Sequence, residues 1–99
     1  MKDIRRPVLI AVDVYCRPLT DQTPTYRLYV NDELFAERSW IWKNIYLEEN
    51  IALNVSPGDY VIKFEVIPPE SAVLKSKNYR VLESQGGVKL LKNLVRITK

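Results

Sequence analysis

Residues 26–42 read YRLYVNDELFAERSWIW, in which two strand-like runs flank the pair Asn31-Asp32. Both residues of this pair tolerate the positive φ that a two-residue hairpin turn requires. The stretch therefore predicts a central β-hairpin, and the rest of the chain is interpreted around it.

A two-residue turn also predicts which residues of the two strands face each other. The predicted pairs are Val30 with Glu33, Tyr29 with Leu34, Leu28 with Phe35, Arg27 with Ala36 and Tyr26 with Glu37.

Side chains on a strand alternate between two faces, so the hairpin has an apolar face and a mixed face. The apolar face, expected to be in the core, carries Tyr26, Leu28, Val30, Phe35 and Ile41. The mixed face carries Arg27, Tyr29, Leu34, Arg38, Trp40 and Trp42.

Five residues of the mixed face combine aromatic rings with guanidinium groups, and we call them the platform: Arg27, Tyr29, Arg38, Trp40 and Trp42. Flat rings on a rigid sheet stack on sugars or bases, and arginines hold phosphate or carboxylate. The platform also suits a protein interface. The competing interpretation is structural, with arginines packed across aromatics and a bulge that turns Trp40 inward.

The length of 99 residues indicates one domain, and 46% apolar with 27% charged residues is an ordinary globular balance. We expect residues 1–6 to form a flexible arm and residues 7–99 to form the single domain. The apolar run Val8 to Val12 is far too short to span a bilayer, so no membrane partner is expected.

Basic residues precede that run as they do in a signal peptide, but Asp3 and Asp13 interrupt the pattern and no small-residue cleavage site follows. We therefore expect no secretion by a signal peptide. The single Cys16 cannot form an internal disulfide, which favours a cytoplasmic site of synthesis.

Further strands are predicted from period-two alternation, with turn residues between them. The predicted segments are 8–16, 45–55, 60–67, an edge strand at 72–82, and 88–97 with an irregularity near Lys92-Asn93. Residues 88–97 also suit one face of a helix. Glu49 interrupts the apolar face of 45–55, which predicts a bulge or a switch between sheets near residues 48–50.

About seven strands at this spacing, with frequent turns, predict an antiparallel β-sandwich, with a jelly roll as the alternative. Residues 55–66, VSPGDYVIKFEV, resemble the proline-glycine turn and Tyr-led strand of immunoglobulin-like and fibronectin-like modules. This resemblance implies an immunoglobulin-like architecture, although the Cys/Trp/Cys core of true immunoglobulin domains is absent.

A second resemblance concerns RLYVNDELFAERSWIW at 27–42, followed by YLEEN at 46–50. The pattern resembles small proteins of marine tailed bacteriophages, in which compact β-sandwiches serve as capsid decorations or as neck and tail components. It implies a structural protein located in a virion, and it transfers no functional residue.

The sequence contains no histidine, which removes the usual general base and most zinc sites. No glycine-rich phosphate loop is present either, so we expect no enzyme, no catalytic residue, no cofactor and no metal. A calcium site built on Glu48 and Glu49 is disfavoured because strand neighbours point to opposite faces.

The net charge of +3 conceals a bipolar chain, since residues 31–70 hold eight acidic and three basic groups while residues 71–99 hold one and seven. This pattern suits head-to-tail self-association or an acidic partner. The candidate basic patch is Lys75, Lys77, Arg80, Lys89, Lys92 and Arg96.

These observations predict a non-enzymatic structural module, an accessory protein of a phage virion that docks onto other protein subunits of a larger assembly. Two alternatives remain open. The first is a carbohydrate-binding module that uses the platform, and the second is a small nucleic-acid-associated protein that uses the basic patch.

Overall fold

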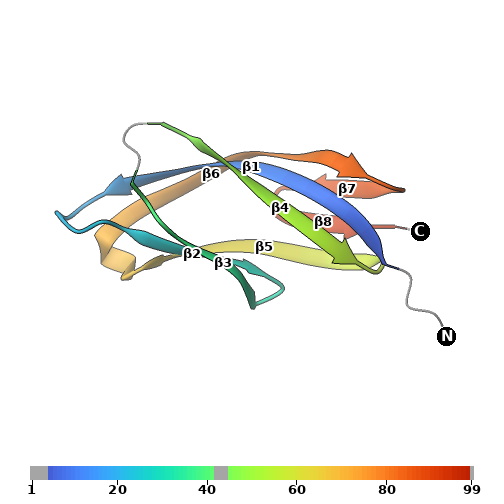
Figure 1. Cartoon of the computed structure of the whole chain (residues 1–99), viewed down its shortest axis with the longest axis horizontal. Helices are drawn as coiled ribbons and strands as arrows, with labels where there is room; N and C mark the ends of the chain where they lie inside the picture. Colours follow the sequence, from blue (N-terminus) through green and yellow to red (C-terminus); the bar gives the residue numbers. More distant parts are fainter. Residues whose placement is uncertain (1–4, 42–44, 99) are drawn as a thin grey trace.

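The computed structural model describes residues 5–41 and 45–98, which form two antiparallel sheets packed face to face as a β-sandwich (Figure 1). One sheet has the strand order β4-β1-β6 and the other has the order β3-β2-β5-β8-β7. The strands are β1 (Arg6–Pro18), β2 (Thr25–Val30), β3 (Glu33–Ser39), β4 (Leu47–Val55), β5 (Gly58–Ile67), β6 (Ala72–Ser84), β7 (Val88–Leu91) and β8 (Leu94–Ile97), with a 3₁₀ turn η1 (Pro69–Ser71). The predicted all-β sandwich is confirmed.

β1 lies at the centre of the three-stranded sheet, and its alternation explains why. Its β-branched residues at every second position face the other sheet and are fully buried, as predicted. From the opposite sheet, β2, β5 and β8 contribute the facing layer. The buried core consists of Val8, Ile10, Val12, Val14, Cys16, Tyr26, Leu28, Trp40, Ile51, Leu53, Ile62, Val95 and Ile97.

The predicted hairpin is present, and its turn has the expected backbone, with φ of 50° at Asn31 and 66° at Asp32. The predicted register holds for the first two pairs after the turn. It then fails because a bulge leaves Phe35 without a partner, so that Leu28 pairs with Ala36. This shift by one residue reverses the inward and outward positions along the rest of β3.

The predicted core face of the hairpin is therefore correct on β2 and wrong beyond it. Tyr26 and Leu28 are buried, whereas Phe35 and Ile41 are exposed. Trp40 instead points into the core, which confirms the alternative in which a bulge turns it inward.

Neither the bulge nor the switch between sheets predicted near residues 48–50 is present, because β1 and β4 pair in one unbroken register from Arg6↔Val55 to Val14↔Leu47. Glu49 faces Val12 and points into the core like its neighbours Leu47 and Ile51. The sheet continues through this position because partners from the other sheet bind the carboxylate, as described below.

Residues 88–97 form a hairpin rather than the single irregular strand that the sequence predicted. β7 and β8 pair from Val88↔Ile97 to Leu91↔Leu94, and Lys92 adopts the positive φ of 57° that a two-residue turn requires. The described residues consequently form eight strands.

The first five strands connect as they do in an immunoglobulin domain. β1 and β4 occupy the positions of strands B and E, while β3-β2-β5 occupy those of C′-C-F. β6 departs from that topology, since it pairs with β1 in the opposite sheet instead of with β5. The short β8 occupies the strand position beside β5 and pairs only with residues 58–61 of β5.

The described part of the predicted arm joins the domain. Arg6 opens β1, and its guanidinium donates to the main-chain oxygens of Gln85 and Thr98. Arg5 donates to the main-chain oxygen of Asn54 at 3.4 Å. The remaining residues of the arm, 1–4, lie outside the described residues.

Candidate functional site

The bulge at Phe35 divides the predicted platform between the two faces of the five-stranded sheet. Arg27 and Tyr29 lie on the outer face, whereas Arg38 and Trp40 lie on the side that faces the other sheet. The fifth residue, Trp42, lies outside the described residues. The four described platform residues therefore do not form one continuous surface.

Of the inner pair, Arg38 belongs to a polar cluster between the two sheets, together with Glu49 and Tyr26. Glu49 is 3% exposed, and it accepts hydrogen bonds from Arg38 Nε at 2.8 Å and from the hydroxyl of Tyr26 at 2.5 Å. The bond to Glu49 raises the pKa of Arg38, and burial together with the nearby carboxylate raises the pKa of Tyr26. These three groups satisfy one another and hold β2, β3 and β4 together.

Trp40 packs against aromatic rings from both sheets. Its ring lies 6.2 Å from that of Tyr15, at an interplanar angle of 79°, and 6.4 Å from that of Tyr26. Edge-to-face contacts of this kind stabilise aromatic pairs beyond the burial of their area. Trp40 is a core residue, which removes it from any surface that stacks on a ligand.

The outer pair is engaged in contacts along the sheet surface. Arg27 Nε lies 2.6 Å from a carboxylate oxygen of Glu37, its partner across the hairpin. Tyr29 donates to a carboxylate oxygen of Glu65 on β5 at 3.1 Å. Both side chains therefore make contacts between neighbouring strands, which stabilise the sheet.

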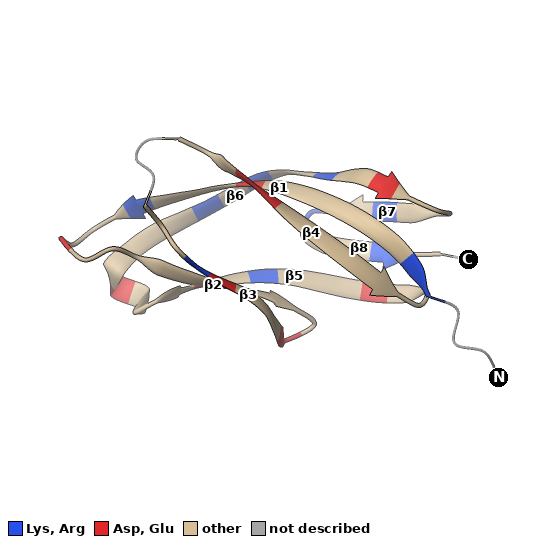
Figure 2. Cartoon of the chain, viewed as in Figure 1, with Lys and Arg blue, Asp and Glu red and all other residues tan. Residues whose placement is uncertain are grey.

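The residues of the basic patch spread over three strands and one turn, and Figure 2 shows cationic and anionic residues interspersed on both sheets. Arg96 on β8 forms a bidentate contact with Asp59, at 2.9 and 3.3 Å, which lowers the pKa of that carboxyl. Lys77 lies 4.0 Å from the ring centroid of Tyr46, in a cation–π contact. Lys75, Lys89 and Lys92 are exposed.

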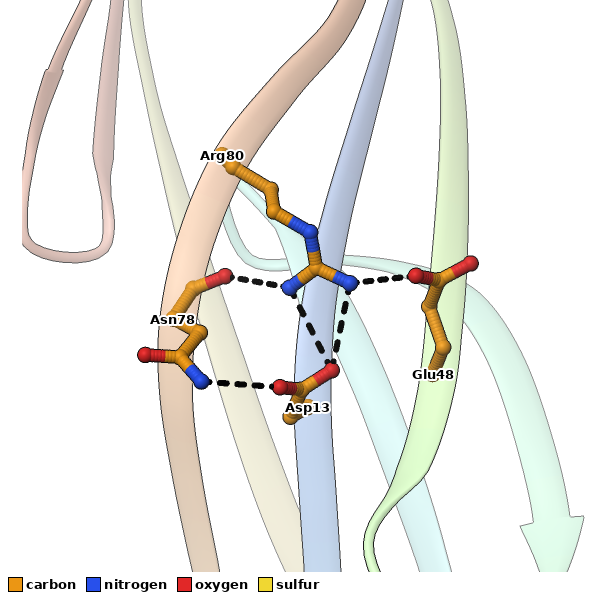
Figure 3. Close-up of polar contacts among 4 residues, drawn as sticks. All are labelled: Asp13, Glu48, Asn78 and Arg80. Atoms are coloured by element: carbon orange, nitrogen blue, oxygen red, sulfur yellow. Dashed lines mark hydrogen bonds and ion pairs between the residues drawn. The ribbon is translucent and has the colours of Figure 1, made fainter.

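Arg80 is the most strongly held member of the basic patch (Figure 3). Its guanidinium bridges β1 and β4 by contacting Asp13, at 3.2 Å, and Glu48. A bulge in β6 places Asn78 at φ 56°, where its side chain donates to Asp13 at 2.9 Å. The hydrogen bond from Asn78, followed by the contacts with Arg80, lowers the pKa of Asp13.

The β2-β3 hairpin carries two exposed apolar side chains, of which the sequence had placed only Leu34 outside the core. β3 is an edge strand, and within it Leu34 is 58% exposed and Phe35 is 41% exposed. Ile41 and Ile45 are also exposed, but Ile41 lies beyond the opposite end of β3 from this pair. The signal was hidden because Phe35 was placed in the core by a register without a bulge.

A groove of about 660 Å³ opens at one edge of the sandwich, between β5, β6 and the tip of the β7-β8 hairpin. Its lining combines half-buried apolar residues with amide, hydroxyl and ammonium groups, and no acidic residue. The lining residues are Ile62, Lys63, Phe64, Leu74, Ser76, Asn78, Tyr79, Leu90, Lys92 and Asn93.

Within the described residues, 5–41 and 45–98, no group of three or more carboxylate or cysteine side chains is arranged to hold a metal ion. No helix in this part of the chain has the length and hydrophobicity needed to span a bilayer.

Comparisons with known proteins give no relative. The sequence matches no family model, and no curated protein or solved structure is significantly similar to it.

Proposed function

We propose that this chain is a non-enzymatic docking module of a larger protein assembly and that it makes its contact through the β2-β3 hairpin. The observation that carries the proposal is the exposure of Leu34 and Phe35 on an edge strand. Natural proteins usually cover or charge such an edge, because its free main-chain groups and apolar side chains promote association with another chain.

The charge of the hairpin defines the partner. Asp32 and Glu33 lie next to the apolar pair, are exposed, and form no ion pair within the described part of the chain. The complementary surface is therefore an apolar patch bordered by lysine or arginine on another protein subunit. Apolar burial would supply most of the affinity, and charge would steer the encounter.

The resemblance of residues 27–42 and 46–50 to phage proteins directs the proposal to a virion, where such a module would act as a decoration, neck or tail protein. The two alternatives have less support. Trp40 is buried in the core and therefore cannot stack on a sugar. Arg80 and Arg96 are engaged in ion pairs, which leaves fewer cations to bind nucleic acid.

The test is incorporation into the native assembly, measured as copies of this protein per particle. We expect the parent chain to be present at a fixed ratio and the double variant Leu34→Ser/Phe35→Ser to fall by about tenfold or more, because apolar anchors dominate interfaces. Leu91→Ser is the control, since Leu91 on β7 is as exposed as Phe35 and lies away from the β2-β3 hairpin. Thermal melts of all three proteins establish that they are folded.

The proposal fails if the parent chain has no fixed ratio, or if the hairpin variant is incorporated like the parent. A strong signal on a glycan array would favour the carbohydrate alternative instead. DNA retention that falls steeply with salt would favour the nucleic-acid alternative.

A further inference from the structure

One edge of β5 lacks a neighbouring strand over its second half. β8 pairs with residues 58–61, and Asn93 closes the ladder by accepting from the amide of Ile62 and donating to its oxygen, both at 2.8 Å. Main-chain groups alternate in direction along a strand, so those of Phe64 and Val66 point to the same side as those of Ile62. Within residues 5–41 and 45–98, neither of these two residues has a main-chain hydrogen bond on that side.

At Phe64 this uncovered edge forms one wall of the groove described above, and Val66 lies just beyond the lining. In an immunoglobulin domain the last strand would continue along β5 at this position. Here the tip of the β7-β8 hairpin ends beside Ile62, and β6 pairs with β1 in the other sheet. The open edge and the groove thus have one origin, a strand position that the described part of the chain leaves unfilled.

The floor of the groove would accept apolar side chains. Phe64 and Leu90 from one sheet and Leu74 from the other are only partly buried, and all three line the groove. A strand placed along β5 would point every second side chain onto them and the others toward solvent.

The charge at the groove is positive. Lys63, on the outer face of β5, and Lys92, at the hairpin tip, both line it. Neither lysine forms an ion pair within the described residues, and no lining residue is acidic. An incoming segment is therefore stabilised if its solvent-facing side chains are aspartate or glutamate.

We propose that this groove is a peptide-binding site that takes an extended segment of a partner protein, with alternating apolar and acidic residues, as an added strand beside Phe64 and Val66. The main-chain groups of these two residues supply hydrogen bonds, the groove supplies apolar contacts, and Lys63 and Lys92 select the charge. The site is separate from the β2-β3 hairpin and does not depend on the function proposed above.

The probes are fluorescein-labelled hexapeptides with glutamate at alternate positions and Val, Ile, Leu or Phe between them. Binding to the full chain is followed by fluorescence anisotropy. A matched series carries lysine in place of glutamate, and a third series carries N-methyl groups on the central amides. We expect binding only from the first series, because the second repels the lysines and the third cannot complete the ladder.

Two protein variants separate this site from general charge attraction. Lys63→Glu/Lys92→Glu should weaken the acidic peptides by about tenfold or more, whereas Lys89→Glu, on β7 outside the groove, should change binding less than about twofold. Hydrogen exchange followed by NMR gives the main-chain readout. The amides of Phe64 and Val66 should exchange readily in the free protein and become protected at saturation.

The proposal is overturned if no alternating acidic peptide binds at about 1 mM, a concentration that detects even weak complexes. It is also overturned if peptides bind without protecting Phe64 and Val66. Equal weakening by Lys89→Glu would reduce the interaction to a general attraction for acidic chains and would likewise reject the site.

Discussion

Arg38 on β3 and Glu49 on β4 form an ion pair that joins the two sheets, with 2.8 Å between Nε and Oε1. The carboxylate is buried while the guanidinium reaches the surface, where its side chain is 45% exposed. The hydroxyl of Tyr26 donates to the other carboxylate oxygen, so a buried negative charge has partners on both sides. This pair exists only because the bulge at Phe35 turns Arg38 inward.

Glu49→Ala should destabilise the domain by about 2–4 kcal/mol, since it leaves the buried hydroxyl of Tyr26 without an acceptor. The solvent-exposed side of Arg38 limits the loss. Chemical denaturation followed by tryptophan fluorescence gives the free energy of unfolding. Glu37→Ala is the matched control, because its pair with Arg27 is exposed and should cost less than about 1 kcal/mol.

Tyr26→Phe should cost about 1–3 kcal/mol on its own, and its effect should not add to that of Glu49→Ala. A double-mutant cycle measures the coupling between the two residues. Additive losses would show that the hydrogen bond contributes nothing to stability.

Trp40→Ala should cost about 3–5 kcal/mol, because it opens a large cavity between rings from both sheets. Leu34→Ala removes an exposed apolar side chain from the same hairpin and should stay within about 0.5 kcal/mol of the parent. Thermal and urea unfolding of both variants checks the contrast. A stable Trp40→Ala protein would place this residue on the surface.

Cys16 should be inert to thiol reagents in the native protein, because it is fully buried and burial raises its pKa from 9.0 to about 11. A raised pKa means that the folded state holds the proton more tightly than the unfolded state. The stabilisation is therefore complete below pH 9 and is lost as the pH rises toward 11. Unfolding should become easier by about 1 kcal/mol between pH 8 and pH 10.

The control for this alkaline effect is Cys16→Ala, which removes the thiol and should reduce the pH dependence in that window, leaving the smaller contribution of Tyr26. Urea midpoints at pH 8, 9 and 10 on both proteins give the comparison. Rapid labelling of the native parent by a maleimide would contradict the burial of the thiol.

Asn31 should stabilise the domain through its side-chain hydrogen bonds as well as through its turn conformation. Its side-chain oxygen accepts from the amide of Val61 at 2.7 Å, and its side-chain nitrogen donates to the oxygen of Asp59 at 3.1 Å. Asn31→Gly keeps the positive φ but loses both bonds, so it should destabilise the domain by about 1–2 kcal/mol.

Asp32→Gly is the comparison for the turn, because it relaxes a positive φ of 66° at a side chain that forms no hydrogen bond with the described residues. It should be neutral or stabilising by up to about 1 kcal/mol. If Asn31→Gly and Asp32→Gly have the same free energy of unfolding, the two side-chain bonds to β5 do not contribute to stability.

Local pattern alone determined most of the strands and the β2-β3 turn, although it did not reveal that residues 88–97 form two strands. The alternation in β1 is long and unambiguous, and Asn31-Asp32 has the side chains that a tight turn requires, so both predictions hold. The inward set on β5, including Ile62 and Phe64, follows from the same period-two rule. These features depend on neighbours within one or two residues, which a sequence displays directly.

The tertiary structure decided the positions where a local rule has two solutions. A bulge at Phe35 reverses the two faces of β3, and the sequence does not reveal it, because apolar and charged residues occur at both phases of the alternation. The tertiary structure also decided the position of Glu49. This carboxylate is buried because Tyr26 and Arg38 from the opposite sheet bind it.

Sheet packing and register also decided the open groove and the distribution of the platform residues over two faces. Whether β6 pairs with β1 or with β5 depends on the packing of the whole sandwich, and this choice leaves the edge at Phe64 uncovered. Residues that a sequence groups on one face are brought together only if the register is uninterrupted. The sequence therefore determined which residues form strands, and the packing of the two sheets decided which of their side chains and edges remain available to a partner.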